Sequence, residues 1–263
     1  MKAPATSSML SATRALAIRS LTVALRRPQF LMPMLVFPSL LLAVNSGGLS
    51  QAQHLPGFPP VPSFFDFQLP AAISQSLLLG GVGTGIAVAL ELEMGFFERL
   101  VAAPIPRSAI VLGRLLAAAG IAVIQVTWFL ILGLVFGHGI ADGVVGLVEV
   151  YLIGCTAAVG FAGIGLTLAF RAGNASSVQG FFPLVFVVLF LSSAFFPADL
   201  LTSPVNEIAR WNPLSYIATG MRAPIIGYGG TSDVLEGIAA AIGVALLFGG
   251  LATHALHRRL RLG

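Results

Sequence analysis

Residues able to carry out chemistry are sparse in this chain, and the first candidates are glycines in an apolar run. They are Gly80, Gly81, Gly83 and Gly85. Phosphate-binding loops also collect glycines, but they continue into Gly-Lys-Ser/Thr and follow a β-strand. This stretch does neither, so we interpret Gly81, Gly85 and Ala89 as small residues that let two helices approach closely. The same spacing recurs in two other apolar runs, at Gly154, Ala158 and Ala162, and at Gly237, Ala241, Ala245 and Gly249.

Metal-binding and catalytic arrangements are equally weak. His254 and His257 have a spacing that metal ligands can use, but Arg258 and Arg259 follow them directly. That combination is more typical of a basic cluster at a membrane boundary than of a metal site. An intramembrane enzyme would need a paired catalytic set, which the sequence lacks. We therefore expect that the chain is not an enzyme and itself binds no metal or cofactor.

Ion-coupled transport usually needs ionisable side chains deep in a membrane. Glu91 ends one apolar run and Glu149 lies early in another, so neither is clearly at mid-depth. Glu149 fits either an interfacial acid or a residue of a transport pathway. Other polar residues of the apolar runs fit substrate contacts and helix packing equally well. They are Asn45, Ser74, Gln75, Ser76, Thr84, Gln125 and Thr127.

The densest group of charged residues and prolines is GFFERLVAAPIPRSAIVLGRLL, residues 95–116. Glu98 and Arg99 begin a short amphipathic element. Pro104 and Pro106 end it and fix the angle at which the chain turns back. A membrane subunit would use such an element to receive force from a soluble partner. The alternative, an ordinary basic loop, accounts only for the arginines that follow the prolines.

Composition places these elements in a membrane. The 263 residues are 57% hydrophobic and 9% charged, with a mean hydropathy of +0.94. A soluble domain would carry about 25% charged residues. We attribute the net charge of +4 to basic residues that flank spanning helices, and not to nucleic-acid binding. The single cysteine, Cys155, is interpreted as a packing residue.

The expected fold is an all-α integral membrane protein, because a spanning helix needs about 20 mostly apolar residues and several such runs occur. Pro33 and Pro38 interrupt the first run, which we expect to be a retained span and not a cleaved signal peptide. The six predicted transmembrane helices are residues 29–46, 71–91, 109–136, 144–170, 179–196 and 235–256.

Basic residues predict the orientation of these spans, since they gather on the cytoplasmic side of membranes. Twelve lie on the side of the two termini, and only Arg210 and Arg222 lie on the other. The sequence therefore predicts that both termini are cytoplasmic. The twelve are Lys2, Arg14, Arg19, Arg26, Arg27, Arg99, Arg107, Arg114, Arg171, Arg258, Arg259 and Arg261.

An N-terminal amphipathic helix is predicted over residues 6–28. Leu10, Ile18, Leu21 and Leu25 share one helical face, which favours a helix in the membrane interface. The alternative is a merely basic leader. The arginines expected to reach lipid headgroups are Arg19, Arg26 and Arg27, while Arg14 falls within the apolar stripe.

Two external segments are expected. Residues 47–70 are rich in proline and phenylalanine and read as an irregular loop. Residues 197–234 predict two short helices, over 204–211 and 213–222. We expect the second to lie on the outer leaflet or to dip into it without crossing, in the manner of a re-entrant helix.

Capping signals support those helices. Ser203-Pro204 and Asn212-Pro213 each place a capping side chain before a proline at the first helical position. Asp233 with Glu236 resembles a capping pair that starts the last span.

The stretch ELEMGFFERLVAAPIPRSAIVLGRLL resembles the first cytoplasmic loop of permease subunits of type-2 ABC exporters. FLSSAFFPADLL and IARWNPLSYIATGMR resemble that family's last external region, and the likeness covers essentially the whole chain. It is strongest to the branch of antibiotic-resistance, drug-efflux permeases. The residues that carry the loop resemblance are Glu91, Gly95, Glu98, Arg99, Leu100, Pro104, Arg107, Gly113 and Arg114.

The resemblance implies a permease that works as a homo- or heterodimer with two copies of a separate ATP-binding subunit, which uses ATP and Mg²⁺. It implies a bacterial plasma (inner) membrane location and outward movement of a lipophilic drug or lipid-like substrate between the first, second and fifth spans. A polysaccharide or teichoic-acid exporter is the rival within the family. An ion-coupled or passive transporter is the alternative outside it.

The resemblance also implies roles for three groups of residues. The coupling loop, residues 92–108, would contact the ATP-binding subunit through Gly95, Phe96, Glu98, Arg99, Leu100, Pro104 and Arg107. The leader with Arg14, Arg19, Arg26 and Arg27 would be an interfacial connecting helix. The external gate segment would include Phe196, Pro197, Trp211, Asn212, Pro213 and Tyr216.

Overall fold

The computed structural model describes residues 8–137 and 139–262, and every regular element in that part of the chain is helical. The predicted all-α membrane fold is confirmed. Five described helices are long and apolar enough to cross a membrane. They are α2 (Pro28–Gly48), α3 (Phe64–Glu93), α5 (Arg107–Phe136), α6 (Gly143–Ala172) and α11 (Thr231–Leu262).

Most predicted spans are longer in the structure. The largest shift of a helix start is in α3, which begins at Phe64 and not near residue 71, because the Ser63 side chain caps it by accepting a hydrogen bond from the amide of Asp66 at 3.1 Å. The expected irregular loop of residues 47–70 therefore shortens to 49–63 and contains the 3₁₀ helix η1 (Ser50–His54). In α2, Pro33 and Pro38 lie inside a continuous helix.

The predicted fifth span, residues 179–196, has different limits. It consists of α7 (Ala175–Gly180) and α8 (Phe182–Phe190), joined at Phe181. Asn174 caps α7 by accepting a hydrogen bond from the amide of Ser177 at 2.8 Å, so the helix begins within polar residues. Residues 191–196 form turns and bends and are not helical. The apolar stretch Ala175–Phe190 is shorter than the other five spans, and its crossing stays a prediction.

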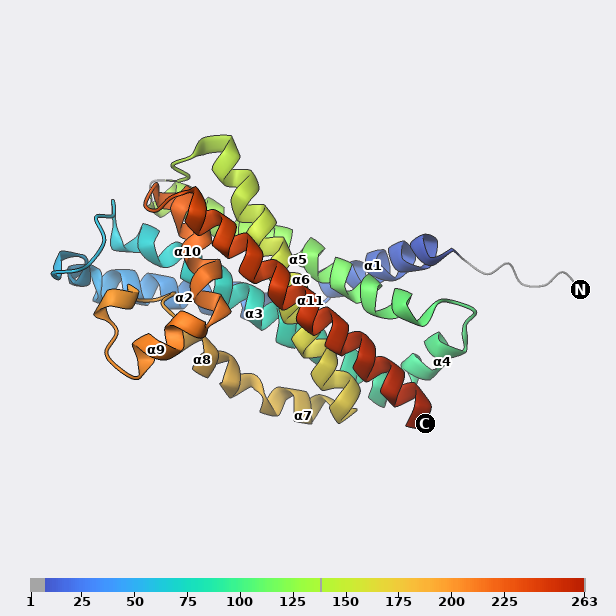
Figure 1. The fold of residues 1–263 in the computed structure, drawn as a ribbon. Coiled ribbons are helices and arrows are strands. Elements are labelled where there is room, and N and C mark those ends of the chain that lie inside the picture. Colours follow the sequence, from blue (N-terminus) through green and yellow to red (C-terminus); the bar gives the residue numbers. More distant parts are fainter. Residues whose placement is uncertain (1–7, 138, 263) are drawn as a thin grey trace, which may run out of the picture.

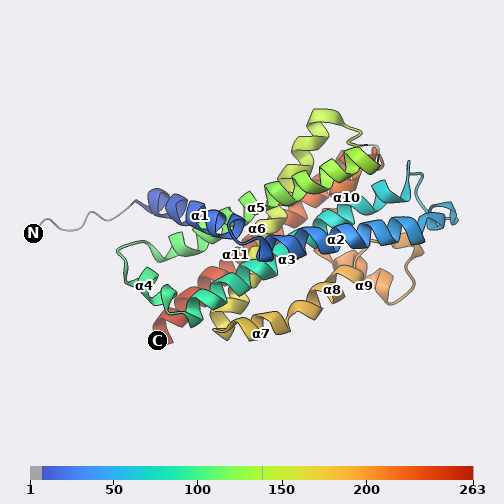
Figure 2. The same cartoon turned by 180° about the vertical axis from the view of Figure 1, so that it is seen from behind.

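The helices run lengthwise in one bundle (Figures 1 and 2). One end, here named the α4 end, holds α4 (Phe96–Ala102), the C-terminal turns of α11 and the α6–α7 junction. The opposite end, named the α10 end, holds residues 49–63 and the α5–α6 connection. Segments predicted on opposite sides of a membrane thus lie at opposite ends of the bundle.

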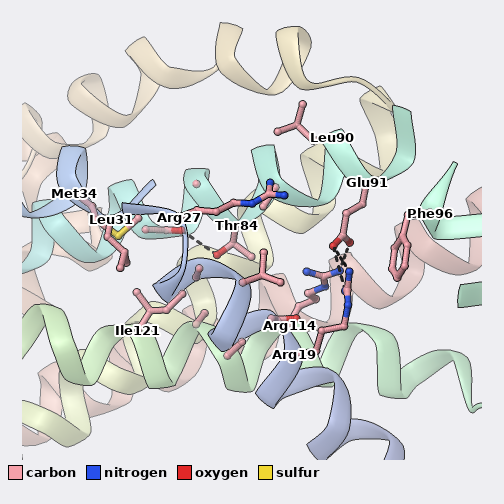
Figure 3. A pocket seen from close by; sticks show the side chains of 18 of the residues that line it. Arg19, Arg27, Leu31, Met34, Thr84, Leu90, Glu91, Phe96, Arg114 and Ile121 are labelled. Atoms are coloured by element: carbon pink, nitrogen blue, oxygen red, sulfur yellow. Dashed lines mark hydrogen bonds and ion pairs between the residues drawn. The ribbon is translucent and has the colours of Figure 1, made fainter. Parts of the chain in front are cut away.

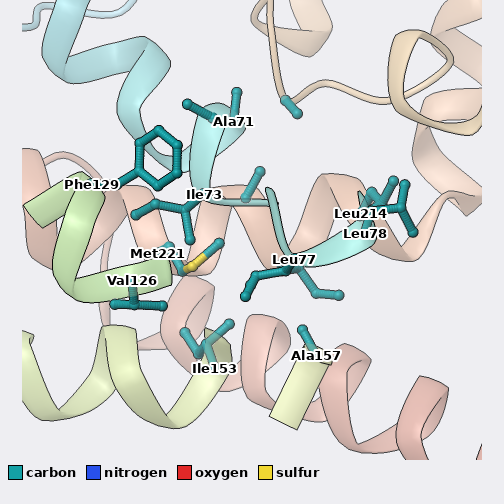
Figure 4. Packing of buried hydrophobic residues seen from close by; sticks show 14 of the residues in the cluster. Ala71, Ile73, Leu77, Leu78, Val126, Phe129, Ile153, Ala157, Leu214 and Met221 are labelled. Atoms are coloured by element: carbon teal, nitrogen blue, oxygen red, sulfur yellow. The ribbon is translucent and has the colours of Figure 1, made fainter. Parts of the chain in front are cut away.

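The core is centred on α3, which packs against α2, α5, α6 and α10. Figure 4 shows Ile73 and Leu77 of α3 beside Phe129 of α5 and Ile153 of α6. Met221 of α10 reaches the same layer and is fully buried. The core therefore joins the spans to the helix that precedes the last one.

Glycines set the closest helix contacts, as their spacing predicted. A Cβ added to Gly85 of α3 would lie 2.5 Å from the carbonyl oxygen of Gly165 in α6. One added to Gly163 of α6 would lie 2.7 Å from the carbonyl carbon of Phe248 in α11. Both distances are too short for any side chain, so these faces need glycine.

The N-terminal helix α1 (Met9–Leu25) packs along α5. A Cβ added to Gly113 would lie 2.7 Å from that of Leu16, and one added to Gly120 would lie 3.3 Å from a methyl of Leu21. From the first contact to the second, residue numbers rise in both helices, so α1 and α5 are parallel. They lie side by side for about two turns. Residues 6 and 7 of its predicted range lie outside the described residues, and its placement at a membrane surface stays a prediction.

At the α10 end, two helices occur where two were predicted: α9 (Val205–Trp211) and α10 (Pro213–Ile226). Asn212 and Pro213 have the expected positions at the start of α10, which is four residues longer than predicted. By contrast, Pro204 precedes the first helical residue of α9 and does not occupy it. In the chain, α9 and α10 follow the 3₁₀ helix η2 (Ala198–Leu200).

The last span also begins earlier than predicted. Asp233 accepts a hydrogen bond from the amide of Gly230 at 2.8 Å and lies within the first turn of α11, which starts at Thr231. The helix that carries this predicted span therefore begins four residues before residue 235, because the Asp233 carboxylate holds the preceding turn in place.

Candidate functional site at the α4 end of the bundle

The short helix α4 follows a turn that its first residue makes possible. Gly95 has a φ of +66°, a left-handed conformation that costs glycine little. It lets the chain reverse between the end of α3 and Phe96. Ala103 is extended, and α5 begins immediately after Pro106. The helix therefore occupies the centre of the predicted loop, residues 92–108.

One face of α4 is anchored in the core. Phe97 is 4% exposed, and its ring lies 5.7 Å from that of Phe170 of α6, between ring centroids. Leu100 packs against the same apolar cluster. Glu98, Arg99, Pro104 and Arg107 are exposed. This part of the chain is amphipathic, as predicted, with an exposed polar face.

A basic hollow of about 980 Å³ lies beside α4, where α5, α6 and α11 also meet. Glu98 is the acidic residue of its lining. The four basic residues are Arg107, Arg171, Arg258 and Arg259. Four positive charges against one negative give this basic hollow a net charge of +3, which would attract an acidic surface.

A buried ion cluster lies on the other side of α4 (Figure 3). Glu91 of α3 is 8% exposed and pairs with Arg114 of α5, which is 7% exposed. Arg19 of α1 donates two hydrogen bonds of 3.3 Å to the same carboxylate. The guanidinium carbon of Arg19 lies 4.1 Å from the centroid of the Phe96 ring. The cluster therefore links α1, α3, α4 and α5.

The cluster corrects two sequence interpretations. Arg19 was expected to reach lipid headgroups and instead pairs with Glu91. Arg114 was counted as an ordinary cytoplasmic arginine and is buried in α5. A signal for the pair did exist, since a charge within an apolar helix needs a partner. The other leader arginines, Arg14, Arg26 and Arg27, are exposed.

At the α10 end, Asn212 lies between α9 and α10 and also bonds to the end of α8. Its side-chain oxygen accepts from the amide of Leu214 at 3.0 Å, and its side-chain nitrogen donates to the carbonyls of Val188 (2.6 Å) and Leu191 (3.0 Å). The side chain therefore fixes α10 to the end of α8. Of the other predicted gate residues, Phe196 and Pro197 are half-buried and Pro213 is exposed.

Two aromatic residues of this segment face outward. Trp211 is 88% exposed, and Tyr216 is 38% exposed and donates to the carbonyl of Arg210 at 2.8 Å. Arg222, expected only as an external basic residue, is buried: it donates to the carbonyl of Ala194 at 2.8 Å and lies 4.0 Å from the Phe67 ring centroid. It ties α10 to α3 and to the turn after α8.

Polar residues inside the spans mainly bond to neighbouring helices or to their own. Gln125 of α5 donates to the carbonyl and the hydroxyl oxygen of Ser76, at 2.7 and 2.9 Å. The Ser76 hydroxyl donates to the carbonyl of Met34 at 2.6 Å. Thr127 hydrogen-bonds to Tyr151 at 2.6 Å. These contacts favour helix packing over substrate binding for these residues. Glu149 is half-buried near the start of α6.

Comparison with known proteins adds the following. Residues 11–226, from α1 to the end of α10, match the family described as "ABC-2 type transporter". Two proteins carrying the name transport permease ycf38 are similar. That of Pyropia yezoensis is 27% identical over 217 residues, covering 82% of this chain and 74% of the relative. That of Porphyra purpurea is 28% identical over 202 residues, covering 75% and 68%.

Proposed function

The chain belongs to the ABC-2 type transporter family, and we propose that it is the membrane-spanning permease subunit of an ATP-driven exporter. ATP and Mg²⁺ are used by separate ATP-binding subunits, in two copies, and this chain binds no cofactor. The proposal rests on the structure of α4. This short helix has an exposed charged face, while its Phe97 is packed in the core.

Two routes connect α4 to the spans. Phe97 contacts Phe170, so a push on α4 moves α6. Phe96 contacts Arg19, whose ion pair with Glu91 leads to α1 and α3. Packed interiors transmit displacement because they have little free volume. This arrangement supports the coupling role that we propose for Gly95, Phe96, Glu98, Arg99, Leu100, Pro104 and Arg107.

The basic hollow supports the choice of partner. Its net charge of +3 and its position beside Glu98 suit an acidic surface of a soluble subunit. A second permease copy, identical or related, would complete the pathway in the bilayer, as in the resemblance. We place the chain in a bacterial inner membrane with both termini on the cytoplasmic side, while the two relatives named above come from red algae.

The proposed cargo is a lipophilic drug or a lipid-like molecule that moves outward. The helix α8 has the sequence FPLVFVVLF, and Leu184, Val187 and Phe190 on it are exposed. Exposed apolar side chains on this helix suit a lipophilic molecule. Glu91 is held by two arginines, which disfavours proton coupling through it.

Charge reversal on α4 tests the proposal. A variant with Glu98→Lys and Arg99→Glu should reach the membrane normally but retain less ATP-binding subunit on purification and show less coupled ATPase activity. Arg210→Glu, at an exposed arginine of α9 at the opposite end of the bundle, is the control and should behave like the unaltered chain. Normal assembly and coupling in the α4 variant would contradict the assignment.

A further inference from the structure

A second hollow, which we name the inner cavity, lies between α1, α2, α3 and α5 and has a volume of about 370 Å³. That size is within the range of small-molecule sites. It belongs to one chain and does not depend on a second copy. Phe96, Arg99 and the Glu91 ion cluster of its lining belong to the coupling route proposed above, but none of those roles places a ligand in the cavity.

The two ends of the inner cavity differ in chemistry. In Figure 3, Leu31, Met34 and Ile121 lie at one end. The ion cluster of Glu91 with its two arginines lies at the other, beside Phe96. Arg27 lies between them, and Arg99 completes the charged lining. The cavity is therefore amphipathic along its length.

Its charges are not balanced. Four arginines (Arg19, Arg27, Arg99, Arg114) and one glutamate line the inner cavity, which leaves 4 − 1 = +3. Arg19 and Arg114 are both engaged by Glu91. Within residues 8–137 and 139–262, Arg27 and Arg99 form no ion pair. Both are exposed, so an anion could reach them from the surface.

The geometry points to an acidic phospholipid as the occupant, and we propose that the inner cavity binds one. Its headgroup phosphate would lie in the charged part of the lining, where Arg27 and Arg99 are the arginines that no carboxylate pairs with and can donate to it. The first part of an acyl chain would lie against Leu31, Met34 and Ile121. A soluble phosphate would leave that apolar end unfilled, and a zwitterionic lipid would leave the excess positive charge uncompensated.

The position of the site gives the lipid a structural effect. Arg27 joins α1 to α2, and Arg99 lies on α4. A phosphate that bridges them would hold these three helices together at the α4 end. Basic pockets between membrane helices on the cytoplasmic side bind acidic headgroups for the same electrostatic reason. The bound lipid should therefore raise the thermal stability of the purified chain.

Native mass spectrometry and thermal unfolding of the full-length chain in detergent test this proposal, with phosphatidylglycerol, phosphatidylcholine and inorganic phosphate as probes. Phosphatidylglycerol should bind and raise the Tm, whereas the other two should not. Combining Arg27→Gln with Arg99→Gln should weaken phosphatidylglycerol binding by at least about tenfold. Arg261→Gln, which removes an exposed arginine at the end of α11 outside the cavity lining, should leave it unchanged.

A second variant examines the apolar end. Gly83 lines the inner cavity, and an added Cβ there would meet only the terminal methyl of Met34, at 3.5 Å. Gly83→Leu should therefore fill the cavity without disrupting the helices and should displace the lipid. Equal binding of phosphatidylcholine or of inorganic phosphate would overturn the proposal. So would a loss of binding in Arg261→Gln as large as in the double variant, or full binding in Gly83→Leu.

Discussion

The rings of Phe97 in α4 and Phe170 in α6 pack together, with centroids 5.7 Å apart, at the point where the short helix meets the bundle. Phe97 is almost fully buried although its neighbours on both sides in the chain are not. This contact makes α4 part of the core and gives an external push a direct path to a spanning helix.

Removal of that contact should uncouple α4 from the spans. We expect Phe97→Ala to lower the stability by about 3 kcal/mol, in the range measured for buried Phe→Ala changes. The ATPase activity of the assembled complex should then respond less to cargo. Met94→Ala is the control, because Met94 is 64% exposed at the same turn. An equal response in both variants, measured in proteoliposomes, would argue against a mechanical role for Phe97.

The ion pair between Glu91 and Arg114 predicts an asymmetric mutational result. Glu91→Gln removes the carboxylate that both arginines share and leaves a buried cation unpaired, which should cost about 3–5 kcal/mol. Changing Glu91→Gln together with Arg114→Met should recover most of this loss, because the buried charge is gone. Thermal unfolding of the single and double variants would measure this recovery. A double variant as unstable as Glu91→Gln alone would show that an unpaired buried cation is not the cause of the loss.

The α3–α6 contact predicts opposite effects at two nearby glycines. Gly85→Ala would place a methyl group 2.5 Å from the Gly165 carbonyl oxygen, so the helices must separate at a cost of about 1–3 kcal/mol. Gly83→Ala has only the Met34 methyl nearby, at 3.5 Å, and should be neutral or slightly stabilising because alanine favours helix. The Tm values of the two purified variants should therefore move apart, and equal shifts would contradict the close packing.

Asn212 should matter more than its exposed neighbour. Asn212→Ala removes the cap of α10 and two hydrogen bonds to the end of α8, with an expected loss of about 2 kcal/mol. Trp211→Ala, at a position 88% exposed, should leave the unfolding temperature unchanged. A stable Asn212→Ala variant would show that α8 and α10 are held by other contacts.

The long spans could be predicted because each is a long apolar run, and α4 because the charged pair Glu98 and Arg99 is followed by two prolines that end the element. The starts of α3 and α7 could not, since Ser63 and Asn174 cap them outside the long apolar runs. A search for apolar runs does not detect a cap. The early start of α11 at Thr231 has the same kind of cause in Asp233.

The candidate site was predictable only in part. The sequence located the charged face of α4, because Glu98 and Arg99 are neighbours in the chain. It could not show that Glu98 faces the basic hollow while Arg99 faces the inner cavity. The pairing of Arg19 with Glu91, 72 residues apart, depends on how α1 and α3 are rotated, which hydrophobic patterning alone does not specify.

Crosslinking from α4 tests the central claim, that this permease takes its energy from a separate ATP-binding subunit. Cys155 would first be replaced by serine, and a single cysteine introduced by Glu98→Cys or, at the opposite end, by Trp211→Cys. In native membranes, Glu98→Cys should crosslink to a protein with a Gly-Lys-Ser/Thr phosphate loop, and Trp211→Cys should not. Failure of Glu98→Cys to capture such a protein, with uphill transport by the purified chain alone, would contradict the account.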